Sequence, residues 1–252
     1  MCYKSFVWAI SLISIIISGC AATEPMESKL KAPPSEGAGF VPVQQMAKNP
    51  ELPFNKAWFK EGVNWEQYRT IYIAPVNTDY LIQATWWQQG MRADQMQQDA
   101  REMATFMQTQ FVSAFQNDPQ HRFRVVLTPE RGSLTLEMAL TELVPSKVLL
   151  NAIETFGPYG SGLAARVMER GTEAQSAVAF EARLKDTDTG ETLAMAADKE
   201  YVVARPIDVK GFTWYANAKD VVKTWAQQFV DVANRRPGEI IKPASTFSLK
   251  PW

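Results

Sequence analysis

Cys20 combines a reactive thiol with surroundings that are typical of protein export. It follows the apolar run Phe6–Ile17, which is preceded by Lys4 and the free amine and closed by the small residues Ser18 and Gly19. A positive start, an apolar stretch too short to span a bilayer as a helix, and small residues at its end are typical of a secretory signal. The sequence therefore predicts that residues 1–19 are a signal peptide.

Ile17, Ser18, Gly19 and Cys20 resemble the lipobox of bacterial lipoproteins. The resemblance implies cleavage before Cys20, a thioether-linked lipid on its sulfur and acylation of the new N-terminus, with palmitate as the expected fatty acid. In such proteins an Asp after the cysteine commonly retains the chain at the inner membrane. Here Ala21 follows, which favours the periplasmic face of the outer membrane. The alternative, a secreted protein cut after Ala22, would discard Cys20 with the signal.

Asp186–Glu191 is an acidic loop of the kind that can bind calcium. Its acidic residues do not fall in the register of an EF-hand, because Gly190 stands where a further oxygen ligand is needed. We therefore favour a polar hairpin turn in which Gly190 adopts positive φ. No metal site is predicted.

A glycine cluster, Gly157, Gly160 and Gly162 with Tyr159 among them, could let backbone amides approach a phosphate. The Lys-Ser/Thr pair of a Walker loop is absent, and Tyr159 replaces the first glycine of a nucleophile elbow. We interpret the segment as a flexible connection. The alternative is a flap that touches a partner or a membrane, because apolar residues precede it.

His121 is the only histidine, so a histidine-based hydrolase would have to use it. It lies in Pro119–Arg122, an expected exposed turn before a strand, and no serine nearby completes a triad. Removal of the signal leaves Cys20 as the only cysteine, which excludes a Cys/His zinc site. No catalytic residue and no cofactor are predicted, and the protein is not expected to be an enzyme.

Trp86 and Trp87 lie in a polar stretch flanked by glutamines. Paired tryptophans there are either anchors in the core, which we favour, or exposed docking residues. Trp58 and Trp65 present the same choice.

The net charge of the chain is close to zero, which gives no sign of nucleic-acid binding and is compatible with a function in the envelope. Removing the signal removes one basic residue, Lys4, and leaves 25 basic against 27 acidic residues. With no internal disulfide available, the domain must be held by its apolar core.

Two amphipathic helices and several strands are predicted to position these residues. Apolar side chains recur every three or four residues over Ala93–Phe115 and Thr213–Asn234, which predicts helices. Strands are expected at Thr70–Val76, Phe123–Leu127 and Leu134–Leu140, and as a hairpin with one wet face on either side of the 186–191 turn. The order predicts a single α+β domain: a mostly antiparallel sheet of about 4–5 strands with both helices on one face.

Domain boundaries follow from composition. Residues 20–53 are rich in proline, with Ser35–Gly39 between, and read as a flexible tether. The alternative is that Phe40–Val43 docks on the domain or on a partner. Residues 54–252 are expected to form the folded domain.

Several segments together resemble the bacterial lipoproteins of domain of unknown function 3313. The resemblance rests on Tyr68–Val76, the long helix ending near Phe115, Arg124–Val126 and Phe180–Glu191. It supports a lipoprotein with a compact α+β domain and implies no activity, substrate or site residues.

Two functions are expected from these residues. The preferred one is an accessory, structural or interaction module of the cell envelope, which meets an unidentified envelope protein through a sheet edge, the Trp86–Trp87 loop or the Gly157–Gly162 segment. The alternative is a lipoprotein that binds a small molecule or glycan with its aromatic residues. A single deep, aromatic-lined cavity would favour the alternative.

Overall fold

A computed structural model describes residues 37–81, 93–144, 175–203 and 216–243. Two long helices and a six-stranded sheet make an α+β fold, which confirms the expected class. In the part of the chain described, no helix is long and apolar enough to cross a membrane.

The sheet has the strand order β1-β6-β5-β4-β2-β3 and is mixed. The strands are β1 Lys56–Phe59, β2 Thr70–Ile73, β3 Arg124–Val126, β4 Leu134–Val144, β5 Gln175–Asp186 and β6 Thr192–Val203. β2 is parallel to both β3 and β4, and the other pairs are antiparallel. The predicted sheet of 4–5 mostly antiparallel strands is therefore wrong. The chain passes from β2 through a helix to β3, and such a crossover makes the two strands parallel. The four-residue β1 is too short to show a pattern.

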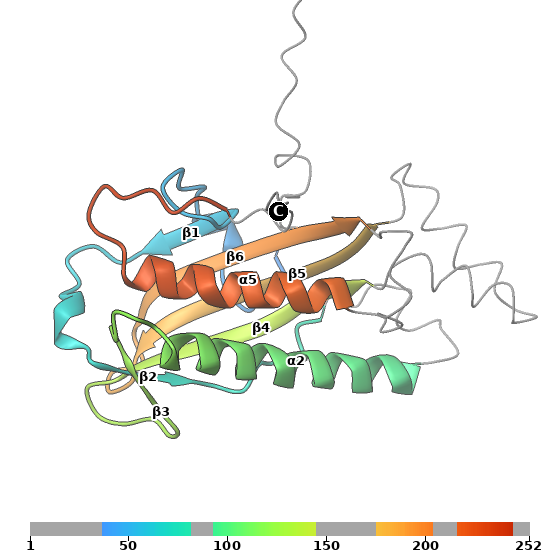
Figure 1. Ribbon diagram of the computed structural model, residues 1–252, viewed down its shortest axis with the longest axis horizontal. Helices are drawn as coiled ribbons and strands as arrows, with labels where there is room; N and C mark the ends of the chain where they lie inside the picture. The colour runs from blue at the N-terminus through green and yellow to red at the C-terminus, as the bar shows by residue number, and fades with distance from the viewer. Residues whose placement is uncertain (1–36, 82–92, 145–174, 204–215, 244–252) are drawn as a thin grey trace, which may run out of the picture.

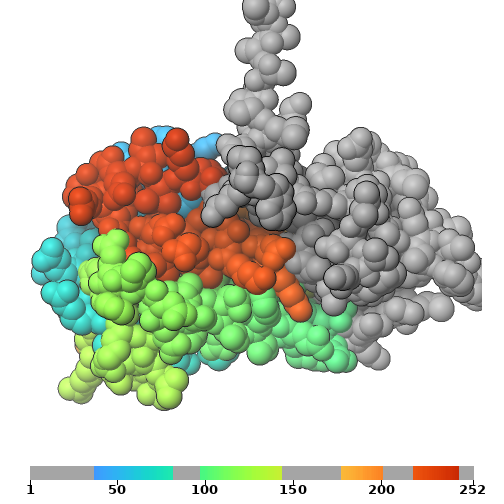
Figure 2. Space-filling view, in the orientation of Figure 1, coloured from blue at the N-terminus to red at the C-terminus, as the bar shows by residue number. Residues whose placement is uncertain are grey.

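Both long helices cover the same face of the sheet, as predicted. Helix α2, Ala93–Gln116, and helix α5, Ala216–Ala233, run side by side in the same direction (Figures 1 and 2). Their apolar stripes face the sheet, so that Met107 and Phe111 of α2 and Val221 and Trp225 of α5 are fully buried.

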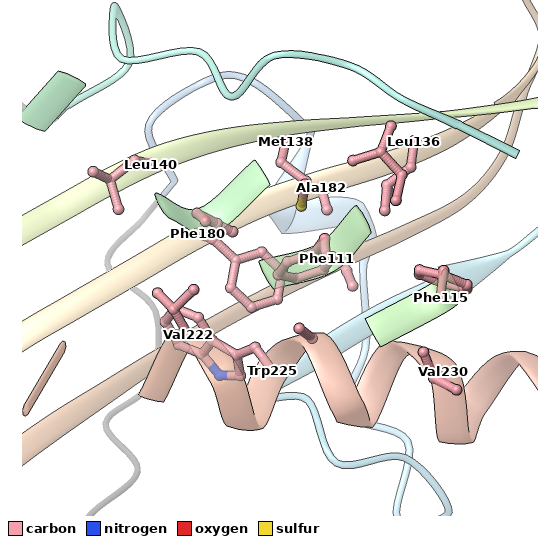
Figure 3. Close-up of a cluster of buried hydrophobic side chains, with 14 of the residues drawn as sticks. Phe111, Phe115, Leu136, Met138, Leu140, Phe180, Ala182, Val222, Trp225 and Val230 are labelled. Carbon is pink, nitrogen blue, oxygen red and sulfur yellow. The ribbon is translucent and has the colours of Figure 1, made fainter. Parts of the chain in front are cut away.

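Aromatic rings fill the space between the helices and the sheet. Phe180 of β5 lies at the centre, with its ring centroid 4.6 Å from that of Trp225 and 5.6 Å from that of Phe229 (Figure 3). The indole Nε1–H of Trp225 donates to the buried carboxylate of Asp198, at 3.0 Å. The core is thus mostly apolar, and this hydrogen bond is a buried polar contact between α5 and the sheet.

The opposite face of the sheet is covered by residues 37–47, which include the short 3₁₀ helix η2, Val43–Gln45. Phe40, Val41, Val43 and Met46 are buried there. They pack on an apolar patch of the sheet formed by Ala139, Met195 and Ala197. The expectation of a flexible tether up to residue 53 is therefore wrong for residues 37–53, and the alternative of Phe40–Val43 docking on the domain is confirmed. Single apolar side chains in an irregular segment carry no periodic signal.

The side chain of Glu181 on β5 forms hydrogen bonds with the backbone of residues 37–47. Its carboxylate accepts hydrogen bonds from the backbone N–H of Ala38, at 2.5 Å, and of Val41, at 2.9 Å. The side chain is only 3% exposed, although the alternation of β5 predicted a wet face. The guanidinium of Arg183, two residues on, lies 4.5 Å from the ring centroid of Phe40. The expected wet face is therefore partly an internal contact surface.

We expect Glu181→Ala to lower the free energy of unfolding by about 2–3 kcal/mol. The reason is that it removes the charged acceptor of two N–H groups, that of the buried Val41 and that of the partly buried Ala38. The segment 37–47 should loosen first, which hydrogen exchange at Ala38 and Val41 would detect. Glu61→Ala, at an exposed turn, is the matched control and should change stability by less than about 0.5 kcal/mol. Unchanged exchange at Val41 in the Glu181 variant would contradict this role.

The acidic turn after β5 is held by its own hydrogen bonds. Gly190 has φ of 70°, which confirms the predicted hairpin turn. The carboxylate of Asp186 accepts from the backbone N–H of Asp188 and Thr189, at 2.9 and 2.8 Å, and from the hydroxyl of Tyr68, at 2.6 Å. Burial and this bond raise the pKa of Tyr68 to about 12, and the bond lowers the pKa of Asp186. The described residues contain no group of three or more His, Cys, Asp or Glu that could hold a metal.

Candidate ligand pocket

A cavity of about 750 Å³ opens beside the C-terminal ends of α2 and α5. Its floor is the sheet, including Leu136, Ala182 and Ala196, and its walls include Phe115 of α2 and Phe229 of α5. Leu136, Ala182 and Phe115 are at most 3% exposed, so the inner end reaches the apolar core. We call this cavity the aromatic pocket.

Six aromatic side chains line the aromatic pocket, from four separate parts of the chain. They are Phe54, Phe59, Trp65, Phe115, Phe123 and Phe229. Phe59 is 40% exposed, and its ring meets that of Trp65 edge to face, with centroids 6.3 Å apart. Asn64 helps to hold this rim, because its side chain accepts from the N–H of Glu66 at the start of the 3₁₀ helix η3, Trp65–Gln67. The exposed ring of Phe59 and the half-buried ring of Trp65 thus lie at the rim of an apolar interior.

Arg122 forms part of the pocket lining, and its guanidinium contacts two backbone carbonyls and one aromatic ring. Its guanidinium donates to the carbonyls of Tyr68 and Trp65, at 2.9 and 2.6 Å, and its carbon lies 4.4 Å from the ring centroid of Phe123. Its backbone N–H donates to the buried carboxylate of Asp118, at 3.0 Å. Burial, and next the charge of Arg69, lower the pKa of Arg122. Its charge is therefore fixed in place by uncharged acceptors.

Arg235 and Arg236 follow α5 and line the pocket beside Pro237. The guanidinium of Arg235 forms an ion pair with Glu51. Arg236 is exposed and its backbone N–H donates to Glu239. Its guanidinium makes no hydrogen bond or ion pair with any other part of the chain that the structure describes.

The described part of the pocket lining has few ionisable side chains. These are four arginines and Glu66, and the described lining contains neither a histidine nor a hydroxyl or thiol nucleophile. The size of the cavity falls in the range of small-molecule sites, about 300–1,000 Å³.

The sequence alone does not predict that these residues line one cavity. Trp65, for which the sequence left open a core anchor or an exposed docking residue, is one of the aromatic residues in the lining. Trp65 is partly buried against the main core, and Trp58 packs partly against the opposite face of the sheet. Phe115, Phe123 and Phe229 arrive through tertiary contacts, which spacing along the chain does not reveal.

The other residues singled out from the sequence are not among the described residues that line the aromatic pocket. His121 is exposed in a turn with φ of 48°, as expected for its loop. The lipobox Ile17–Cys20, the pair Trp86 and Trp87, and the Gly157–Gly162 segment lie outside the described residues.

Comparison with known proteins gives a family but no activity. The profile of the family described as "Protein of unknown function (DUF3313)" matches residues 37–229. No curated protein matches the chain. Two solved structures are distantly similar, both of PelC dodecamers from Paraburkholderia phytofirmans. The L103M dodecamer has 9% identity and TM-score 0.36, covering 68% of this chain and 94% of its own. The other has 8% identity and TM-score 0.39, covering 71% and 97%.

Proposed function

The chain belongs to the DUF3313 family of unknown function, and we propose that it is a non-enzymatic lipoprotein of the bacterial envelope that binds an apolar small molecule. The aromatic pocket carries this proposal. A cavity of about 750 Å³ with six aromatic side chains is a large apolar surface left open beside the core. Burial of apolar surface is the main driving force of small-molecule binding in such sites.

The pocket favours small-molecule binding over the preferred expectation of a module that only contacts envelope proteins. That expectation named three contact surfaces: a sheet edge, the Trp86–Trp87 loop and the Gly157–Gly162 segment. The last two are outside the described residues. A glycan is the weaker ligand, because sugar hydroxyls need paired donors and acceptors. The lining offers few such groups besides Asn64, Glu66 and the arginines. Contact with an envelope protein elsewhere on the molecule is compatible with ligand binding.

The proposed location is the periplasmic face of the outer membrane. It is supported by the lipobox-like residues Ile17–Cys20 and by Ala21 after them. Since residues 37–47 pack on the domain, the tether between Cys20 and the domain is at most 16 residues.

Binding can be tested with a neutral fluorescent probe, N-phenyl-1-naphthylamine, and the full chain carrying Cys20→Ser, purified without detergent. We expect saturable binding with a blue-shifted emission. Ala233→Trp places a large ring in the pocket lining at the end of α5 and should weaken probe binding at least about tenfold, which corresponds to about 1.4 kcal/mol.

Gln227→Trp is the matched control, because it adds the same ring on the exposed side of α5. Its affinity for the probe should equal that of the parent. Equal weakening by both variants, or no saturable binding by the parent, would reject the aromatic pocket as a ligand site.

A further inference from the structure

The charges at the aromatic pocket are not balanced. Of the four arginines in its lining, Arg183 is paired with Glu137, at 2.6 Å, on the opposite face of the sheet, and Arg235 is paired with Glu51. Arg122 and Arg236 form no ion pair with described residues. Against them stand Glu66 in the lining and Glu239 next to it, whose carboxylate accepts from the backbone N–H of Arg236. Both carboxylates are exposed, as Arg236 is, so that solvent screens all three charges. Among the side chains that line the pocket, positive charge is therefore in excess.

The apolar and the charged parts of the pocket occupy different places. The interior is bounded by buried side chains such as Leu136, Ala182 and Phe115. The arginine with an unpaired guanidinium, Arg236, is exposed next to Pro237 at the rim. An apolar interior beneath a positive rim is complementary to a molecule with a long apolar part and an anionic end.

We propose that the aromatic pocket binds a single-chain amphiphile with one negatively charged head group. The acyl chain enters between the sheet and the two helices, and the carboxylate or phosphate lies against the guanidinium of Arg236, with Arg122 behind it. This rests on the proposed function and adds the chemical class of the ligand. A neutral apolar molecule would leave the positive charge at the rim uncompensated.

The test is displacement of N-phenyl-1-naphthylamine from the full chain carrying Cys20→Ser, at ligand concentrations below the micellar range. Decanoate, decyl phosphate and decanol share one chain length and differ in the head group. We expect at least one of the two anions to displace the probe at about fivefold lower concentration than decanol. The anion that displaces the probe at the lower concentration identifies the preferred head group, carboxylate or phosphate. In a series from octanoate to dodecanoate, each added methylene should strengthen binding about fourfold.

Arg236→Gln should weaken the better anion about three- to fivefold while leaving decanol and the probe unchanged, since it removes a surface charge and no apolar contact. Arg131→Gln is the matched control, because it removes an exposed arginine that is not part of the pocket lining. Because Arg236 lies on the surface, its replacement should leave the fold intact, and the chain-length series needs no variant at all.

Two failures are distinguishable. If the probe binds but decanol displaces it as well as both anions do, the pocket binds apolar molecules and the anionic ligand class is wrong. An Arg236→Gln variant that weakens decanol and anion equally would also overturn the proposal. If neither the probe nor any of these ligands binds, the proposed function itself fails.

Discussion

Replacing Trp225 by alanine is expected to lower the free energy of unfolding by about 3–5 kcal/mol, because it removes a large and fully buried side chain. The indole packs edge to face on Phe180, at 4.6 Å between ring centroids, in the middle of the helix–sheet interface (Figure 3). Neighbouring rings such as that of Phe229 cannot refill the volume without leaving their own contacts. Urea or guanidinium denaturation of the purified chain would measure the loss.

A second replacement at the same position separates packing from hydrogen bonding. Trp225→Phe keeps most of the ring contact but removes the indole N–H that donates to Asp198, at 3.0 Å. Asp198 is fully buried and also accepts from the N–H of Asn55. Loss of one donor to such a carboxylate should cost about 1–3 kcal/mol.

Trp65→Ala is the control for this pair, because Trp65 is a half-buried tryptophan at the rim of the pocket and lies outside the packed centre. Its loss should cost clearly less than that of Trp225. If Trp225→Ala costs less than about 1 kcal/mol, the helix–sheet interface is not the main source of stability.

Replacing Cys20 by serine should abolish membrane anchoring. A hydroxyl at this position does not form the thioether that the lipobox resemblance implies, so no acyl chain is attached. Each buried methylene of a lipid contributes about 0.8 kcal/mol, and two or more chains hold a protein stably on a bilayer. We expect the variant to lose incorporation of labelled palmitate and to leave the membrane fraction almost completely.

Cys2→Ser is the matched control, since Cys2 is the only other cysteine and lies within the predicted signal. That variant should be acylated and anchored as the parent is. Mass spectrometry of the processed chain gives the direct measurement: the mature N-terminus should begin at Cys20 and carry the mass of the lipid. An unmodified N-terminus, or membrane retention of the serine variant, would contradict the lipoprotein proposal.

Local patterns predicted the helices and most strands well. The stripe that includes Met103, Met107 and Phe111 predicts a helix, and α2 covers Ala93–Gln116. Alternation likewise predicts the hairpin of β5 and β6, whose turn has Gly190 at positive φ. These features depend on neighbours three or four residues apart, or on the two faces of one strand, and such spacing is present in the sequence itself.

Long-range contacts decided the rest. The parallel direction of β2 beside β3 and β4 follows from how strands distant in the chain pair, and no single segment contains that information. The packing of residues 37–47 on the sheet depends on hydrogen bonds to Glu181, which is more than 130 residues away in the sequence. A proline-rich segment without periodicity therefore looks like a tether until its partner in the sheet is known.

The aromatic pocket likewise depends on long-range contacts, whereas the elements around it follow from local patterns. The sequence by itself predicts an export signal and a lipid site at Cys20, and its amphipathic pattern was sufficient to determine an α+β core. Only the tertiary structure brought Trp65, Phe115 and Phe229 around one cavity with Arg122 and Arg236 in its lining. The physical reason is that a secondary-structure element needs only local periodicity, whereas a cavity forms where the ends of several elements fail to fill the space between them.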